Sequence, residues 1–263
     1  MNSDAQRAQF LAQGYCLIPN VIPAARLAEI RESVARDVWA HSLLERPTGY
    51  VPGFLRFNQS LVPYLACDAV LGFVRSFFGA HVRISMITGT VNGPGIPRGK
   101  LHSDWPYNQE GAAHVEVPYP DCLMHIVTMW MLSDFTESGG GTIIVPGSHR
   151  LGYHPTKDGA LDPSQPFPGE RQLVGKAGTV AMFDARLWHA VAPNRDDQER
   201  VAVIVRYAPW WLNLDPLRPG TVDRQQIVEA NSGKDSHVPP LTREVFDQLP
   251  PDVKLLVRYS VAA

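Results

Sequence analysis

Residues 200–207 read RVAVIVRY, a β-branched and mostly apolar run with an arginine at or near each end. This composition predicts a buried strand. From residue 81 onward the chain contains further short apolar runs, separated by Gly, Pro, Asn and Asp. Short strands at this frequency are typical of a sandwich or closed barrel, whereas βαβ units would need helical crossovers. We therefore predict a mainly β fold, a double-stranded β-helix of the jelly-roll or cupin-like type.

Helical spacing of apolar residues is confined to the first part of the chain. Between Pro23 and Trp39, apolar residues recur every three or four positions, which predicts an amphipathic helix. Residues 61–78 contain one or two more helices. We predict a single domain over residues 1–263: a helical N-terminal part of about 1–80 flanking one sheet, a jelly-roll core of about 81–212 and a proline-rich tail of about 213–263. The tail would wrap the core or contact a second copy in a homodimer.

The composition is that of an ordinary globular protein. The 263 residues are 44% hydrophobic and 19% charged, with a formal net charge of −2, which excludes pervasive disorder. The 24 Lys and Arg residues are dispersed, so no basic patch suits nucleic acid. The first nine residues lack the apolar stretch of a signal peptide, and no segment approaches the ~20 apolar residues that span a bilayer. We expect a cytoplasmic protein with neither a nucleic-acid nor a membrane partner.

Two histidines and one carboxylate form a candidate metal site. His102 and Asp104 are two residues apart, so on a strand both side chains would point to the same side. A third ligand must come from a distant strand, and His189 lies near the end of the alternating run Gly178–Phe183. Such a triad on one face of an ion leaves the opposite positions open, as in non-haem Fe(II) oxygenases. Dioxygen and an oxo-acid cosubstrate would bind there.

Arg200 is the candidate anchor for that cosubstrate. Strand alternation puts it on one face with Ala202, Ile204 and Arg206. A guanidinium directed into an apolar barrel is costly unless it meets an anion, and its planar fork matches a carboxylate. The distal carboxylate of 2-oxoglutarate is such an anion. The alternative is that Arg200 lies at an exposed strand end and pairs with Glu199 or Asp197.

Several motifs in the same order give the chain a resemblance to the phytanoyl-CoA dioxygenase family of Fe(II)/2-oxoglutarate oxygenases. The motifs are Gly14–Pro19, His102-Ser103-Asp104, Trp130, Gly139–Thr142, Pro146–His149, Leu187-Trp188-His189 and Arg200. The resemblance implies that His102, Asp104 and His189 bind iron, that Arg200 holds the distal carboxylate and that Trp130 lines its pocket. Family members often have a hydroxyl residue two positions after the distal histidine, where this chain has Val191.

The implied reaction uses Fe(II), 2-oxoglutarate and dioxygen to oxidise an unactivated C–H bond, most simply by hydroxylation, and releases succinate. Asp104 favours oxygenation over halogenation, because halogenating relatives have a small residue at that position. The substrate would be a small-molecule metabolite, such as an intermediate of secondary metabolism. Two alternatives remain, a metal-dependent isomerase and a non-catalytic small-ligand-binding cupin. Neither needs a buried arginine beside its metal.

The loops around the metal motif supply the candidates for substrate binding. Residues 92–99 and 107–121 could act as lids, because long connections in a compact domain are often functional. Arg206 would meet either a substrate anion or an internal carboxylate. His149 is interpreted as loop architecture near the site and His125 as structural. The candidate substrate contacts are Trp105, Tyr107, His114 and Arg206.

Overall fold

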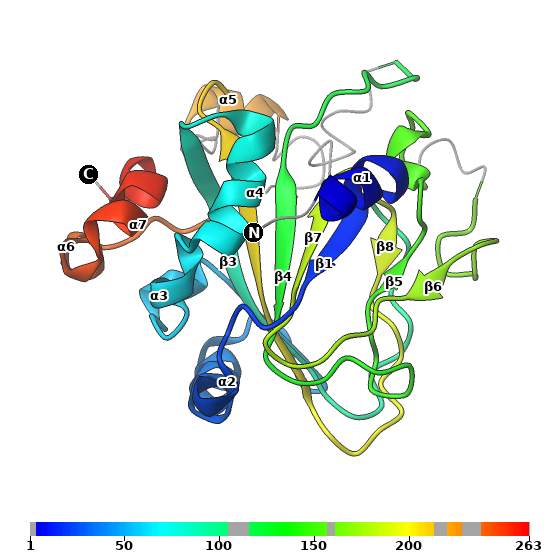
Figure 1. The fold of residues 1–263 in the computed structure, drawn as a ribbon, viewed down its shortest axis with the longest axis horizontal. Coiled ribbons are helices and arrows are strands. Elements are labelled where there is room, and N and C mark those ends of the chain that lie inside the picture. The colour runs from blue at the N-terminus through cyan, green and yellow to red at the C-terminus, as the bar shows by residue number, and fades with distance from the viewer. Residues whose placement is uncertain (1–3, 105–115, 157–160, 213–219, 228–237, 263) are drawn as a thin grey trace.

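Two antiparallel β-sheets form the centre of the molecule (Figure 1). The computed structural model describes residues 4–104, 116–156, 161–212, 220–227 and 238–262. The larger sheet contains, in spatial order, β1 (Tyr15–Ile18), β7 (Val180–Asp184), β4 (Ile126–Met131), β9 (Arg200–Pro209), β3 (Val82–Asn92) and β2 (Thr48–Pro52). The smaller sheet contains β6 (Arg171–Gln172), β5 (Ile143–Ile144) and β8 (His189–Ala190). The prediction of a mainly β, jelly-roll architecture is confirmed.

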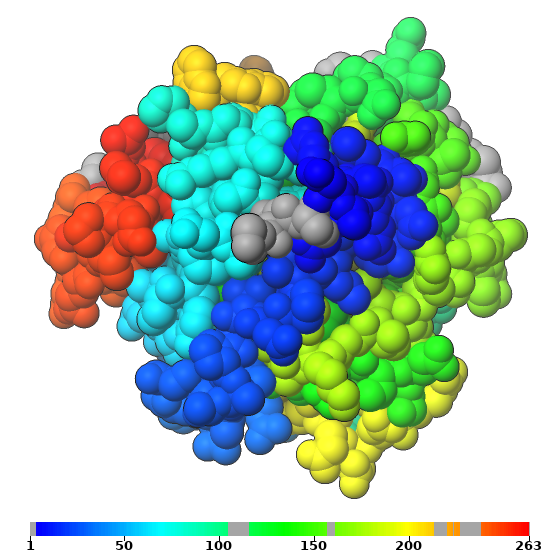
Figure 2. Space-filling view, viewed as in Figure 1, coloured from blue at the N-terminus to red at the C-terminus, as the bar shows by residue number. Residues whose placement is uncertain are grey.

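Helices cover the outer face of the larger sheet. They are α1 (Asp4–Gln13), α2 (Ala24–His41), α3 (Val62–Leu65), α4 (Asp68–Phe78), α6 (Arg243–Gln248) and α7 (Pro251–Val257). A further short helix, α5 (Val222–Ile227), follows the last strand of the larger sheet in the chain. Short 3-10 helices include Phe54–Arg56, Ser148–Arg150 and Arg258–Ser260. In the space-filling view, the blue, cyan and red surfaces, which belong mainly to the first four helices and the C-terminal pair, lie side by side across one face of the molecule (Figure 2). The helices expected within residues 23–39 and 61–78 are therefore present.

The helical spacing of α2 explains its packing. Ile30, Val34 and Val38 are fully buried and join a core that includes Val70 and Phe73 of α4. Burying each such side chain stabilises the fold by about 1.5–3 kcal/mol. The helix starts directly after Pro23, whose fixed backbone torsion suits this position and whose missing N–H is not needed there.

The two faces of the larger sheet bury different cores. On β4, Ile126 and Trp130 belong to the core beneath the helices, whereas Val127, Met129 and Met131 belong to the core between the two sheets. This alternation follows from the period of two along a strand. It decides which side chains can reach a site between the sheets.

The N-terminal part differs in one respect from the sequence-based expectation, and the C-terminal tail packs on the core. The N-terminal part is not only helical, because β1 and β2 form the two edges of the larger sheet. The C-terminal tail packs on the core through Val253 and Leu256, and the Tyr259 hydroxyl donates to the Ile84 carbonyl at 2.6 Å. Among the described helices, none combines the length and apolar character needed to cross a membrane.

Candidate metal centre

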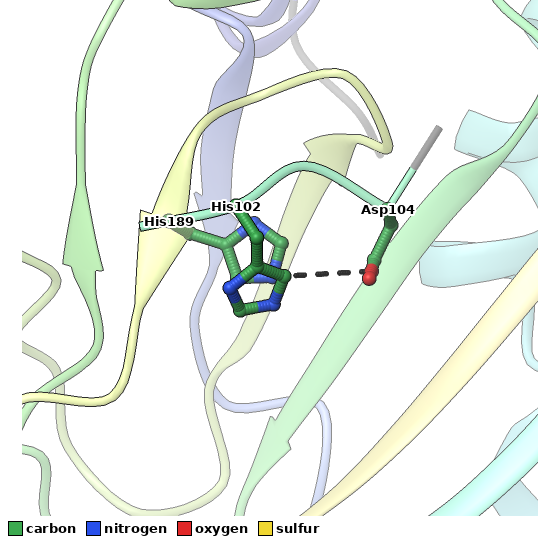
Figure 3. A group of neighbouring side chains, drawn as sticks. All are labelled: His102, Asp104 and His189. Atoms are coloured by element: carbon green, nitrogen blue, oxygen red, sulfur yellow. Dashed lines mark ion pairs between the residues drawn. The ribbon is translucent and has the colours of Figure 1, made fainter. Parts of the chain in front are cut away.

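His102, Asp104 and His189 come together between the sheets as the sequence predicts. One ligand atom from each lies within 4.8 Å of the others. Figure 3 shows the two imidazole rings side by side and the Asp104 carboxylate facing them. His102 and Asp104 do not belong to a regular strand, and His189 begins β8 instead of ending the preceding run, which forms β7. An isolated antiparallel bridge joins His102 to His189.

Backbone carbonyls fix the orientation of both histidine rings. The Nδ1 atom of His102 lies 2.9 Å from the Lys100 carbonyl oxygen, and Nδ1 of His189 lies 2.9 Å from the Leu187 carbonyl oxygen. A carbonyl can only accept, so each Nδ1 must hold the proton and each Nε2 keeps its lone pair for a metal. Burial, together with the neighbouring His102 ring, lowers the pKa of His189 to about 4. His189 is therefore neutral at pH 7, as a metal ligand must be.

The two oxygens of Asp104 have different partners. Oδ2 lies 3.9 Å from Nε2 of His189, whereas Oδ1 accepts a bond from Nη2 of Arg206 at 2.6 Å. Burial alone would raise the pKa of Asp104, but the charge of Arg206, with smaller contributions from the nearby histidines, lowers it below its usual range. The carboxylate is thus ionised at neutral pH. Two imidazoles and one carboxylate fit Fe(II) with open coordination positions.

Arg200 is buried at the start of β9, on the face between the sheets. Its Nη1 lies 3.5 Å from the Thr142 hydroxyl and 3.9 Å from the Met129 sulfur, and its guanidinium carbon lies 4.6 Å from the centre of the Phe135 ring. Within the described ranges no carboxylate pairs with it, and its Nε has no hydrogen-bond partner. Burial lowers its pKa to about 10, so it remains charged at pH 7.

The alternative of an exposed Arg200 at the end of a strand is therefore wrong. Arg200 is only 5% exposed. Glu199, its proposed partner, instead accepts bonds from the Trp39 indole at 3.0 Å and from Arg46 at 3.2 Å. A buried charge without a counter-ion is costly, so an anion beside this guanidinium would stabilise it.

Two further contacts hold the metal-binding segment in place, and the sequence reasoning did not identify them. Nε2 of His154 lies 3.2 Å from both the backbone nitrogen and the carbonyl oxygen of Ser103, and its Nδ1 lies 3.2 Å from the backbone nitrogen and 2.7 Å from the hydroxyl of Thr156. His154 lies in a loop, where no periodic pattern marks it. Arg98 makes a two-pronged ion pair with Glu170, both bonds 2.8 Å long, which fixes the loop before His102. Residues 92–99 are thus anchored to the loop at residues 161–170.

A family model described as phytanoyl-CoA dioxygenase (PhyH) matches residues 10–202, which is more than half of the 263-residue chain. The chain belongs to the phytanoyl-CoA dioxygenase family. The matched region of this family member contains the complete triad and Arg200.

Curated relatives include fungal dioxygenases. The chain is 26% identical over 144 residues to dioxygenase af480 of Aspergillus fumigatus, covering 54% of this chain and 42% of that protein. It is 29% identical over 147 residues to dioxygenase ALT11 of Alternaria alternata, covering 55% of this chain and 45% of that protein. The matches thus span less than half the length of each fungal protein.

Solved structures share the fold. The crystal structure of the epimerase SnoN with Fe3+, α-ketoglutarate and nogalamycin RO superposes with a TM-score of 0.63 at 18% identity, covering 84% of this chain and 91% of SnoN. HygX from Streptomyces hygroscopicus with nickel and 2-oxoglutarate bound gives a TM-score of 0.63 at 17% identity, covering 85% of this chain and 94% of HygX. At these identities the likeness shows the fold of this phytanoyl-CoA dioxygenase family member.

The structure does not place Trp130 beside Arg200. Trp130 is fully buried under the helices, and its indole donates to the Thr128 hydroxyl at 2.9 Å on that same face. Met129, one residue earlier, takes the face toward Arg200. The expected pocket role of Trp130 is therefore corrected: its side chain points away from the guanidinium. The indole is a structural element of the helix-side core.

Thr142 supplies a hydroxyl that Val191 does not. The Thr142 side chain is buried, and its hydroxyl is the nearest oxygen recorded for the Arg200 guanidinium. The run Gly139–Thr142 was visible as a family motif, but nothing in the sequence assigned its threonine a role. Its position makes it a second candidate partner for an anion at Arg200.

The remaining predicted residues divide into three groups. Arg206 bonds an internal carboxylate, that of Asp104, which was one of its two predicted partners. His149 is buried in a 3-10 helix with Nε2 3.3 Å from the Leu11 carbonyl oxygen, which agrees with loop architecture, and His125 is buried directly before β4. Three candidate substrate contacts lie outside the described residues: Trp105, Tyr107 and His114.

Proposed function

We propose that this protein is an Fe(II)/2-oxoglutarate-dependent oxygenase that hydroxylates an unactivated C–H bond of a small-molecule metabolite. The observation that carries the proposal is the buried Arg200, a cation for which the described part of the chain supplies no counter-ion, between the same two sheets as the triad. A metal-dependent isomerase or a binding module has no need for such a charge. The dicarboxylate 2-oxoglutarate supplies the matching anion.

The residues present fit each part of this cosubstrate and metal. His102, Asp104 and His189 would hold Fe(II), and the Nδ1 bonds to Lys100 and Leu187 keep both rings aimed at the ion. The iron, with 2-oxoglutarate and dioxygen, supplies the oxidising power and splits the cosubstrate into succinate and carbon dioxide.

Arg200 would then bind the distal carboxylate of 2-oxoglutarate through its planar fork. The Thr142 hydroxyl, which accepts from Arg200 and donates to the Met129 sulfur in the structure, would turn to donate a further bond to this carboxylate. Apolar neighbours complete this end of the pocket, since Met129 and the Phe135 ring both contact the guanidinium. They exclude water and so strengthen the ion pair between Arg200 and the carboxylate. In this way the chain fixes the orientation of the cosubstrate before the substrate enters.

The charged side chains near the metal indicate the class of substrate. Arg206 is bonded to Asp104, so among the described residues it is not an uncommitted cation for a substrate anion. We therefore favour a small, polar or amphipathic metabolite of low negative charge, as in secondary metabolism. The comparison structures contain such compounds, nogalamycin RO with SnoN and hygromycin B with HygX. Epimerisation, as the SnoN name states, is a second outcome that begins with the same hydrogen abstraction.

The proposal is tested by release of labelled carbon dioxide from [1-14C]2-oxoglutarate. We expect slow release that needs Fe(II) and dioxygen, is absent in His189→Ala and is stimulated when the correct metabolite is added. The control is His149→Ala, a buried histidine outside the triad, which should retain the release. Metal-loaded protein that never consumes 2-oxoglutarate would favour the isomerase or binding-module alternative, and product analysis separates hydroxylation from epimerisation.

A further inference from the structure

Arg200 and Arg206 lie on the same face of β9, and each faces a different part of the site. Arg200 contacts Met129 and Thr142, at the proposed position of the distal carboxylate of 2-oxoglutarate. Arg206 reaches the metal end, where its Nη2 lies 2.6 Å from Oδ1 of Asp104. Both partners of this ion pair are only 12% exposed at their side chains.

We propose that Arg206 is a positioning residue of the metal centre: it holds Oδ1 of Asp104, so that the carboxylate offers only Oδ2 to the ion. The inference rests on the proposed iron site and adds to it a residue that does not itself bind metal. Oδ2 is the oxygen that faces the His189 ring, at 3.9 Å from its Nε2. The division of the two oxygens is therefore already present in the structure.

The backbone around the two residues explains why the carboxylate needs an external support. Asp104 lies outside any regular strand, in a bend, and its backbone is held by one bond from its N–H to the Ala185 carbonyl at 2.7 Å. Its carboxylate can rotate about the side-chain torsions and could bind an ion through one oxygen or two. Arg206, in contrast, lies within the larger sheet, opposite Met86 on β3 and Val127 on β4. A residue held within the larger sheet thus fixes a ligand that lies outside any strand.

The strength of the bond supports this role. A bond between a guanidinium and a carboxylate is charge-assisted and shorter than a neutral one. A buried ion pair offsets its desolvation only when the geometry is good, and breaking it by removing one partner is costly.

The competing interpretation is that Arg206 only neutralises a buried charge. The two interpretations predict opposite signs for the affinity of the site for a cation. If Arg206 only neutralises charge, removing it takes away a positive group that repels the metal, and Mn²⁺ should bind more tightly. If Arg206 positions Asp104, removing it should weaken binding, because the carboxylate loses its fixed orientation.

The test is a titration of metal-free protein with Mn²⁺, followed by electron paramagnetic resonance, and with Co²⁺, followed by its visible absorption. For Arg206→Met we expect affinity on the order of 10–100-fold below wild type, the usual cost of losing a group that orients a metal ligand. Arg206→Lys keeps the charge but loses the planar fork, so it should also bind more weakly than wild type. If Arg206 only neutralised charge, Arg206→Lys would bind metal with wild-type affinity. The lysine variant therefore distinguishes the two interpretations even if Arg206→Met does not fold.

Arg200→Met is the matched control, because it removes an equal charge from the same face of the same strand without touching Asp104. Its affinity for Mn²⁺ should equal that of wild type. Tighter or unchanged metal binding in Arg206→Met would overturn the inference while leaving the proposed function intact. Failure of the wild-type protein to bind any of these metals through the triad would instead refute the proposed function itself.

Discussion

His102 and His189 are joined by both hydrogen bonds of an antiparallel bridge. The His102 N–H donates to the His189 carbonyl at 2.9 Å, the His189 N–H donates to the His102 carbonyl at 2.8 Å, and the ring centres are 4.3 Å apart. Two ligands far apart in the sequence are thus fixed by the backbone itself. Because the side chains need little reorganisation, the histidine pair is prepared for a metal before the metal arrives.

Loss of any one triad side chain should remove the site. We expect His102→Ala, Asp104→Ala and His189→Ala to lower Fe(II) affinity greatly and to abolish turnover, because two remaining ligands cannot hold the ion in an open three-ligand geometry. His149→Ala should retain the metal, since His149 lies outside the triad. Iron content after desalting measures the outcome, and full activity in any one triad variant would refute the assignment.

The hydroxyl of Thr142 should contribute to cosubstrate affinity. Thr142→Val keeps the shape of the side chain but removes the oxygen near Arg200, and we expect a loss of about 0.5–1.5 kcal/mol in 2-oxoglutarate binding. Calorimetry on the Mn²⁺-loaded protein measures this difference. Val191→Thr is the informative partner variant: if Val191 faced the anion, adding a hydroxyl there would restore the lost affinity.

Trp130 and Met129 are neighbours on β4, and their side chains lie on opposite faces of the sheet. Substitutions at Trp130 should therefore change stability, and substitutions at Met129 should change cosubstrate affinity. Trp130→Phe should lower the free energy of unfolding by about 1–3 kcal/mol, because it leaves a gap in the helix-side core and removes the indole bond to the Thr128 hydroxyl, yet leave 2-oxoglutarate affinity unchanged. Met129→Leu conserves volume and should cost less than about 1.5 kcal/mol in stability.

Met129→Leu should nevertheless alter 2-oxoglutarate affinity, because the Met129 sulfur contacts Arg200. Urea unfolding and calorimetry on the same two variants separate the two effects. If Trp130→Phe changed cosubstrate affinity at intact stability, the assignment of faces on β4 would be incorrect.

Buried neutral histidines should make the metal-free protein sensitive to mild acid. Burial lowers the pKa of His125 to about 3 and that of His154 to about 4, against 6.5 in the unfolded chain. Between these values the unfolded chain binds more protons, so stability is fully present above pH 6.5 and is lost as the pH falls toward 4. We expect a loss on the order of several kcal/mol between pH 7 and pH 4.5.

Urea unfolding at a series of pH values measures this loss. His154→Gln removes one titrating group, so its unfolding free energy should fall less steeply over the same range. A wild-type free energy that stayed constant between pH 7 and pH 4.5 would contradict the buried, neutral state of these rings.

The sequence predicted the parts of the site that follow from strand periodicity. The alternation of residues 200–207 correctly put Arg200 and Arg206 on one face, and Arg200 is buried, as expected for a guanidinium directed into the barrel. The face of Trp130 could not be predicted, because every residue of β4 is buried and the run contains no alternation of polar and apolar residues. When both sides of a strand are buried, its sequence does not indicate which side chains face the site.

Contacts made through loops could not be predicted from the sequence for a different reason. His154 meets Ser103 and Arg98 meets Glu170 across long stretches of chain that have neither a helical nor a strand period. The pairing of Arg206 with Asp104 likewise depends on how the segment after residue 101 folds back onto the sheet. Only the three-dimensional arrangement selects these partners from the many polar residues available.

The central claim, that the triad and Arg200 together bind metal and 2-oxoglutarate, is tested most directly by anaerobic titration of Fe(II)-loaded protein with 2-oxoglutarate. We predict that the weak visible charge-transfer band of the chelate appears in wild type. In Arg200→Met the band should require on the order of 10–100-fold more cosubstrate, as expected for losing about 1.5–3 kcal/mol of charge-assisted bonding. Absence of the band from iron-loaded wild type, or equal cosubstrate requirements in the two proteins, would contradict the account.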